Sequence, residues 1–361
     1  MAMLIPVTNF SDLTGGGVHA TFGSPILFDL GGLGIRDIRS NGAGQFLIIA
    51  GTADDANSGF VLYEWDGNPA HAPRQTGTTL PQLPSADNLG AWETIESVPS
   101  PLRAGSPVQL MQDDGDVDFY GDRLTSKTGE ITDLQKDLGL VFSYAPPAPS
   151  ETTTTVIASA NPAAPGTAVT LTAVVTGPSD EAKPTGTVTF DVTGADGSTV
   201  SCPAATMTAS GVATCTIAAG GLRASGSVYR VTASYRGDTD DAASTGTAQL
   251  AVNGAPTTTA AVALSLLPLV GKPVSTLVVV APTRSVPALL TGPVKLTVHN
   301  AAGTAVYTTT VTLPKLLPLA AITIPGSAFG SAGSYTVSVA YSGDEFYAPS
   351  STTATVVVHK L

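Results

Sequence analysis

The chain has 361 residues, with 16 Lys and Arg against 28 Asp and Glu, which gives a formal net charge of -12. Such a chain lacks the basic surface that nucleic acid or an anionic membrane requires of a partner. Apolar residues make up 43% of it, enough for packed cores, and no run approaches the roughly 18 apolar residues of a membrane-spanning helix. At about 100 to 200 residues per domain, the length predicts two or three domains.

The first ten residues, Met1–Phe10, carry no basic side chain and reach Pro6 before an apolar stretch of useful length. A secretory signal needs a positive start followed by an apolar core, so the sequence predicts none here. We therefore expect the chain to be a segment of a longer exported protein, or one that has lost its leader.

Residues 1–145 form the first predicted domain, which is acidic and all-β. Short runs rich in β-branched and aromatic residues alternate with Gly, Asn and Asp turns. With 18 acidic and 7 basic residues, this domain carries -11 of the net charge. One helical turn is predicted at Asp133–Asp137. The strand candidates are Ile35–Arg39, Gln45–Ala50, Phe60–Trp65, Trp92–Val98, Val108–Met111 and Val117–Tyr120.

Within this domain, Gly32–Asp37, Phe46–Gly51 and Phe60–Trp65 follow one another in the order of strands in one propeller blade. On these residues the segment resembles part of a β-propeller of the kind found in secreted bacterial phytase-like or esterase-like proteins. A propeller needs at least four blades of four strands, whereas 145 residues supply about one and a half to two. The resemblance therefore implies further blades upstream, and the alternative is a smaller sandwich whose strands look like a blade.

The rest of the chain repeats itself at an offset of 106 residues, because Tyr229–Asp238 matches Tyr335–Asp344. The same offset relates Gly186 to Gly292. It predicts two domains, at residues 151–253 and 254–361, each of about the size of an immunoglobulin-like sandwich. Residues 146–150 form a Pro-rich linker before them, which we expect to be a semi-rigid spacer.

Each repeat is expected to hold about seven short antiparallel strands in two packed sheets. No helical periodicity with capping residues is found in residues 149–361, so the fold class is all-β throughout. Strand candidates in the first repeat are Val169–Val175, Gly186–Val192, Ala213–Ile217, Tyr229–Tyr235 and Thr247–Val252.

Both repeats resemble the bacterial Ig-like repeat that occurs in tandem in large secreted and surface-attached proteins. The resemblance is carried by Gly186–Phe190, Gly211–Cys215 and the Tyr-x-Gly-Asp endings at Tyr235–Asp238 and Tyr341–Asp344. The second repeat departs from it, because it lacks cysteines and contains a Pro- and Leu-rich insertion at Leu313–Leu319. The family implies a stalk, spacer or adhesion module without catalysis.

The only cysteines, Cys202 and Cys215, lie on consecutive strand candidates on either side of the turn Ala209–Gly211. We predict a cross-strand disulfide, which implies an oxidising compartment and stabilises the domain by roughly 3 kcal/mol. Two free buried thiols are the alternative. A zinc site is disfavoured because no further Cys and no nearby His supplies the remaining ligands.

Three alternate carboxylates, Asp114, Asp116 and Asp118, have the spacing of the first half of a calcium loop. The sixth position of such a loop is Gly and the twelfth is Glu, whereas this chain has Phe119 and Thr125 there. An acidic, solvated hairpin turn is therefore the favoured interpretation, and Ca²⁺ is the only cofactor that remains open.

The aromatic residues Tyr63, Trp65 and Trp92 are candidates for a ligand platform that binds sugars, although packing in the core is the commoner role of such residues. The four histidines lie far apart in the sequence, and no Gly-x-Ser-x-Gly elbow is present. No catalytic residue is predicted, and we expect no enzyme activity.

The sequence thus favours a non-catalytic, extracellular or cell-surface protein with a structural, adhesive or self-assembling role. Its expected partners are other copies of itself or cell-surface proteins and glycans. The alternatives are an accessory C-terminal part of a secreted propeller hydrolase and a carbohydrate-binding module.

Overall fold

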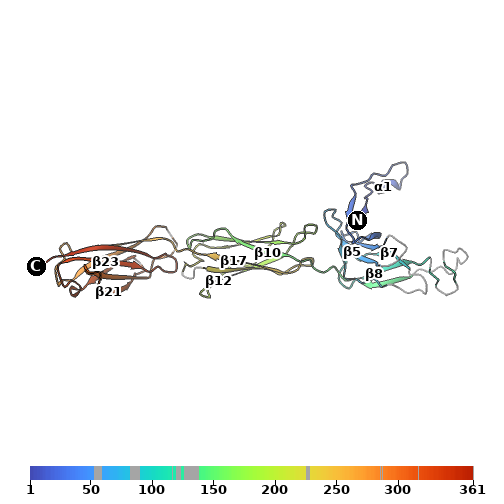
Figure 1. Cartoon of the computed structure of the whole chain (residues 1–361). Helices are drawn as coiled ribbons and strands as arrows, with labels where there is room; N and C mark the ends of the chain where they lie inside the picture. Colours follow the sequence, from blue (N-terminus) through green and yellow to red (C-terminus); the bar gives the residue numbers. More distant parts are fainter. Residues whose placement is uncertain are drawn as a thin grey trace. The chain divides into compact units, whose positions relative to one another are not determined.

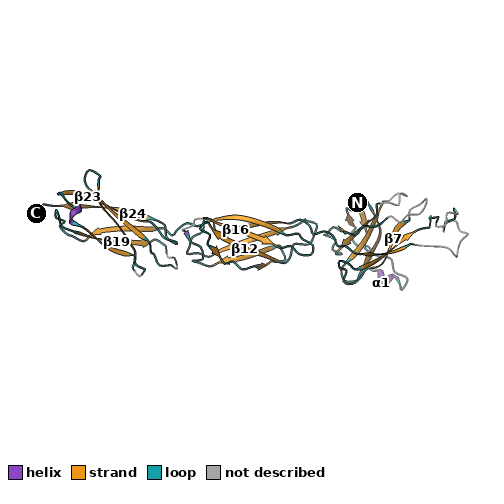
Figure 2. Cartoon of the chain, turned by 90° about the horizontal axis from the view of Figure 1, so that it is seen from below, coloured by secondary structure: helices purple, strands orange, loops and turns teal. Residues whose placement is uncertain are grey.

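The chain is all-β, and strands form nearly all of its regular structure (Figures 1 and 2). The computed structural model describes residues 1–52, 59–81, 90–115, 117–118, 123–125, 138–224, 228–284, 286, 288–315 and 317–360. Within these ranges the helices are one α-helical turn, α1 (Phe10–Leu13), and one 3-10 turn at Gly326–Ala328. Neither is long enough or apolar enough to cross a membrane.

Two compact units make up the chain. The first unit contains residues 1–151 together with two loops, 177–183 and 239–242. The second unit contains residues 152–176, 184–238 and 243–361.

The first unit holds three antiparallel sheets. A two-stranded ribbon pairs β1 (Ala2–Leu4) with β2 (Ile26–Phe28). A four-stranded sheet follows in chain order, with β3 (Gly34–Ser40), β4 (Phe46–Gly51), β5 (Val61–Trp65) and β6 (Arg74–Gln75). The third sheet contains β7 (Ala91–Ser97), β8 (Pro107–Asp113) and β9 (Gly139–Ser143).

Strand β4 is the centre of this unit, because every residue after Phe46 in it is buried. Leu47 and Ile49 face an apolar cluster shared with the β7–β9 sheet. Ile48 and Ala50 face a second cluster, which the ribbon closes from the other side. The continuous apolar run of β4 therefore reflects burial on both faces of its sheet.

Most of the predicted strands of this unit are present within one to three residues of their expected ends. The strand predicted at Val117–Tyr120 is not formed at Val117 and Asp118, and its other two residues lie outside the described ones. The helical turn predicted at Asp133–Asp137 also lies outside them. The short strands β1, β2 and β9 were not predicted from the sequence.

The second unit contains two β-sandwiches of the same strand order. In the first sandwich, one sheet contains β10 (Thr153–Ala158), β11 (Val169–Thr176) and β15 (Val212–Ile217). The opposite sheet contains β13 (Thr199–Val200), β12 (Thr187–Gly194), β16 (Val228–Tyr235) and β17 (Ser244–Ala251), and β14 (Ala205–Thr206) also pairs with β12.

The second sandwich repeats this plan with three strands in one sheet and four in the other. The first of its sheets contains β18 (Thr257–Ala263), β19 (Val274–Pro282) and β22 (Leu319–Ile324). The other contains β21 (Ala305–Thr312), β20 (Pro293–His299), β23 (Gly333–Tyr341) and β24 (Ser350–Val358).

Each sandwich has its own apolar core, because the inward residues of its strands alternate with outward polar ones. In β11, for example, Val169, Leu171, Ala173 and Val175 are buried while the threonines between and beside them are partly or fully exposed. The two cores share no residue.

The Tyr-x-Gly-Asp motif has the same structural role in both sandwiches. In each sandwich the Asp carboxylate of the motif accepts hydrogen bonds from a threonine that lies two residues before the third strand. The Oδ2 atom of Asp238 accepts hydrogen bonds from the backbone N and Oγ1 of Thr185, and Asp344 does the same with Thr291. The sequence repeat is therefore also a repeat of side-chain contacts.

We predict that Asp344→Ala destabilises the second sandwich by about 2–3 kcal/mol. The Asp344 carboxylate also accepts the backbone N–H groups of Phe346 and Tyr347, at 2.8 Å each, so its loss leaves several donors without an acceptor. Hydrogen exchange of peptides from residues 255–358 measures the change. Asp344→Asn, which keeps one acceptor oxygen, is the control and should cost less; equal exchange in wild type and Asp344→Ala would refute the role.

Candidate functional site

A pocket of about 250 Å³ lies in the first unit, beside the end of β5 and strand β6. It is lined mainly by polar and charged side chains from the sheet, the turn between the two strands, and the two loops of residues 177–183 and 239–242. The lining residues are Gly44, Gln45, Glu64, Trp65, Asp66, His71, Ala72, Arg74, Pro147, Glu181, Ala182 and Asp240.

The guanidinium of Arg74 is the main positive charge of this pocket, and it is fully engaged. Its Nη1 donates to Oδ1 of Asp240 at 2.9 Å, and its Nε lies 3.7 Å from Oε1 of Glu181. Its Nη2 donates to the backbone oxygens of Ala148 and Asp240. Arg74 therefore fastens both loops to β6 rather than offering a free charge to an anion.

Glu64 shares a face of β5 with Leu62 and accepts a hydrogen bond from a buried tyrosine. The hydroxyl of Tyr144 donates a short hydrogen bond to Oε2 of Glu64, and Nε2 of Gln45 donates to Oε1 at 3.3 Å. Burial raises the pKa of Tyr144 well above its ordinary value, and the hydrogen bond to Glu64 and its negative charge raise it further. The phenol is therefore neutral at every physiological pH.

His71 and Asp66 form the remaining polar pair, with Nδ1 of His71 located 2.6 Å from Oδ2 of Asp66. The indole Nε1 of Trp65 donates to the backbone oxygens of Asn68 and His71, which fixes the turn that carries the pair. The lining contains no Ser, Thr or Cys, so this His–Asp pair has no nucleophile beside it. The pocket therefore holds a His–Asp pair without a hydroxyl or thiol nucleophile in its lining.

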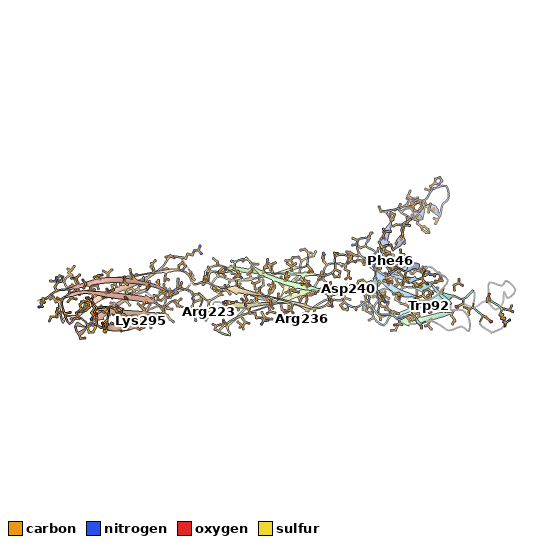
Figure 3. All side chains as sticks on the ribbon, viewed as in Figure 1. Phe46, Trp92, Arg223, Arg236, Asp240 and Lys295 are labelled. Carbon is orange, nitrogen blue, oxygen red and sulfur yellow. A yellow bond between two sulfur atoms is a disulfide. The ribbon has the colours of Figure 1, made fainter. Side chains whose placement is uncertain are left out.

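The three aromatic residues predicted as a ligand platform are core residues. Tyr63 and Trp65 are 8% and 5% exposed and pack with Phe28 under the ribbon. Trp92, which Figure 3 labels, is 1% exposed and belongs to the other cluster. The ring of Trp92 packs edge-on against Phe142, with ring centroids 5.5 Å apart. Of the three, Trp65 lines the pocket described above, and the ligand platform remains a prediction.

The carboxylates predicted for calcium are occupied by backbone groups where they are described. Asp114 is buried, and its Oδ2 accepts the backbone N–H of Leu138 at 2.6 Å. Oδ2 of Asp118 accepts the N–H of Arg123 at 2.7 Å, and Asp116 lies outside the described residues. No three Asp, Glu, His or Cys in the described ranges are grouped to hold a metal ion, and the calcium site remains a prediction.

The disulfide between Cys202 and Cys215 is present, with the two Cα atoms 5.9 Å apart. Its placement differs from the prediction of a bond between consecutive strands. Cys215 lies on β15, but Cys202 lies between β13 and β14, which pair with β12 in the opposite sheet. The bond therefore joins the two sheets of the first sandwich at its core, where both cysteines are buried.

Comparison with known protein families finds a match for the first sandwich. Residues 154–253 match the bacterial Ig-like domain (group 3). The match spans β10 to β17 and ends before the second sandwich. No curated protein matches the chain in sequence.

Two solved adhesins are similar to the chain at low scores. The adhesin InvE of Yersinia pseudotuberculosis is 17% identical over 57% of this chain and 58% of its own, with a TM-score of 0.34. The Escherichia coli adhesin FdeC is 14% identical over 91% of this chain and 96% of its own, with a TM-score of 0.26. The chain thus spans a little over half the length of InvE.

We predict that Tyr144→Phe destabilises the first unit by about 1–3 kcal/mol, because Glu64 loses a donor while the ring remains. Both tryptophans of the chain lie in this unit, so urea unfolding followed by tryptophan fluorescence reports on it. The pH dependence gives a second test. The native state keeps the Tyr144 proton above pH 10 whereas the unfolded state loses it, so stability falls as pH rises above about 10.

The fall should be shallower in Tyr144→Phe, which has no such proton to keep. An unchanged urea midpoint at pH 7, or the same alkaline slope in both proteins, would show that the Tyr144–Glu64 bond contributes nothing.

Proposed function

We propose that the chain is a non-catalytic, extracellular surface protein in which two Ig-like sandwiches act as structural spacer or adhesion domains. The match of residues 154–253 to an Ig-like domain supports this, and so does a disulfide that needs an oxidising compartment to persist. The second sandwich is taken as a further Ig-like repeat because it has the same strand order and the same Asp–Thr contacts. The two adhesins do not support the proposal, because their TM-scores are only 0.34 and 0.26.

The observation that carries the spacer role is the connection between the sandwiches. The backbone N of Asn253 donates to Ala163 of the first sandwich, and the backbone N of Ala255 donates to Phe346 of the second. Only Gly254 separates these two anchored residues. It fits closely, because a Cβ there would come within 2.7 Å of the backbone N of Ala348. Tension on one sandwich is therefore transmitted to the next through one residue rather than through a slack linker.

Force extension of the full chain tests this proposal. We expect one event for each sandwich, of about 36 nm less the folded length of the sandwich, since roughly 100 residues at about 3.6 Å are released each time. The disulfide keeps the chain between its ends, which are 13 positions apart in the sequence, out of the extension. Reduction should therefore lengthen one event by about 4 nm and leave the other unchanged.

The double variant Cys202→Ser, Cys215→Ser is the control and should give the longer event with or without reductant. The spacer role is refuted when no separate sandwich events occur under load.

We also propose that the first unit corresponds to two blades of a β-propeller. Its two larger sheets each run up and down in chain order, and the apolar cluster of Leu47, Ile49, Trp92 and Leu110 packs one against the other. This arrangement supports the alternative of an accessory part of a secreted propeller hydrolase.

The effect of Ca²⁺ on the melting temperature distinguishes this alternative from the spacer role. We expect the tryptophan-monitored melting temperature of the full chain to be the same in Ca²⁺ and in a chelator, because Asp114 already caps Leu138. A rise of several degrees in Ca²⁺ that is lost in Asp118→Asn would favour the hydrolase alternative instead.

A further inference from the structure

The N-terminal ribbon, residues 1–28, is held to the first unit at one end only. Its base is the pairing of β1 with β2, in which Met3 lies opposite Leu27. Further out, Val7 pairs with Phe22 in an isolated bridge, and the tip carries α1. In Figure 1 the ribbon extends away from the other two sheets of this unit.

One face of the ribbon belongs to the core. Ala2, Ile26 and Phe28 are buried there and pack with Tyr63 and Trp65 of β5. This face needs no further partner.

The opposite face is apolar and open. Because side chains alternate along a strand and directly paired residues share a face, Met3 and Leu27 point away from the core. They are 58% and 57% exposed, and Phe22 is 66% exposed beside Val7 at 37%. Two residues separate Leu4 from Val7, whereas three separate Phe22 from Ile26, so the second strand carries one extra residue. Phe22, as the partner of Val7, therefore shares the face of Met3 and Leu27. We call these four residues the outer face.

Further along the ribbon, small and polar residues lie on the side away from Val7 and Phe22. A Cβ placed at Gly23 would meet the side chains of Pro6 and Thr8, at 3.4 and 3.5 Å. Since Gly23 and Phe22 are consecutive on an extended strand, Phe22 points the other way. Val7 and Phe22 thus lie on the face of the ribbon opposite Pro6 and Thr8.

The ribbon as a whole, of which the outer face is one part, exposes the area of a stable protein interface. Eight large apolar side chains of the ribbon are at least 37% exposed. At about 150–200 Å² for each full side chain, they present roughly 800 Å². A specific interface buries about 800 Å² per partner, whereas apolar patches on monomers rarely exceed a few hundred. The eight are Met1, Met3, Ile5, Val7, Phe10, Val18, Phe22 and Leu27.

The distribution of charge favours a second copy of this chain as the partner that covers the outer face. Asp12 is the only charged side chain in residues 1–28, although the rest of residues 1–145 is strongly acidic. Two copies that meet elsewhere on this acidic part bring like charges together, whereas two outer faces meet without that repulsion. A two-stranded ribbon is also marginal by itself in water and gains from being covered.

We propose that the N-terminal ribbon is the interface between two copies of this chain, with the outer faces of the two copies packed against each other about a two-fold axis. The same four residues then contribute from both copies, as an isologous interface requires. This inference rests on the proposed function and deepens it by naming the surface and the partner. The force experiment can succeed while association fails, so the two are tested separately.

Sedimentation velocity of the full chain over a concentration series tests the proposal. We expect the wild type to be a dimer at micromolar concentration and Met3→Lys, Phe22→Lys to dimerise at least 100-fold more weakly, because two ammonium groups per copy would be buried. The matched control is Leu264→Lys, Leu266→Lys in the second sandwich, where both leucines are also exposed. It should dimerise as the wild type does.

A wild type that stays monomeric at 100 µM, or equal dimerisation of the two Lys variants, would overturn the proposal. Unchanged tryptophan fluorescence shows that the first unit is still folded in the Met3 and Phe22 variant.

Cross-linking locates the interface. Both natural cysteines are in the disulfide, so Met3→Cys or Phe22→Cys provides the only free thiol. We expect a short bis-maleimide to link at least one of these variants into a dimer at a concentration where Leu266→Cys stays monomeric. Failure of both ribbon variants, or equal linkage of Leu266→Cys, contradicts the assignment.

Discussion

The apolar face of every strand in this chain has to be covered, and the ways in which this is done explain the rest of the structure. The sandwiches cover theirs with a second sheet of their own, so Leu171 and Val231 meet in one closed core. In the first unit, β4 is covered on both sides, by the β7–β9 sheet and by the ribbon. The outer face of the ribbon has no such cover among the described residues, which is why we propose that association takes place there.

This division separates the roles of the two units. The sandwiches are closed, nearly neutral and joined through Gly254, which suits a part that bears tension. The first unit holds most of the charge, the polar pocket and the open apolar face, so we propose that recognition belongs there. The inter-sheet disulfide fits the same division, because it fastens the two layers of the first sandwich against separation.

Strands with a strong alternating pattern, such as Val169–Val175 and Tyr229–Tyr235, could be predicted from the sequence because their period decides both type and buried face. The three-residue strand β1 could not, because its pairing with β2 depends on contacts across more than twenty residues. Composition alone does not decide whether a tryptophan side chain is buried or exposed. The burial of Trp92 is therefore known only from the structure. The pocket was missed because Arg74 meets Asp240 across 166 residues of sequence.

Hydrogen exchange of the full chain at several protein concentrations compares closed and open strand faces in one experiment. It therefore tests whether the uncovered face of the ribbon associates while the covered strands do not. Amides of β11 and β16 should be strongly protected and independent of concentration. Amides of β1 and β2 should gain protection as concentration rises, because the dimer covers them. Protection of the ribbon that does not change with concentration, or sandwich strands that exchange freely, would contradict the account.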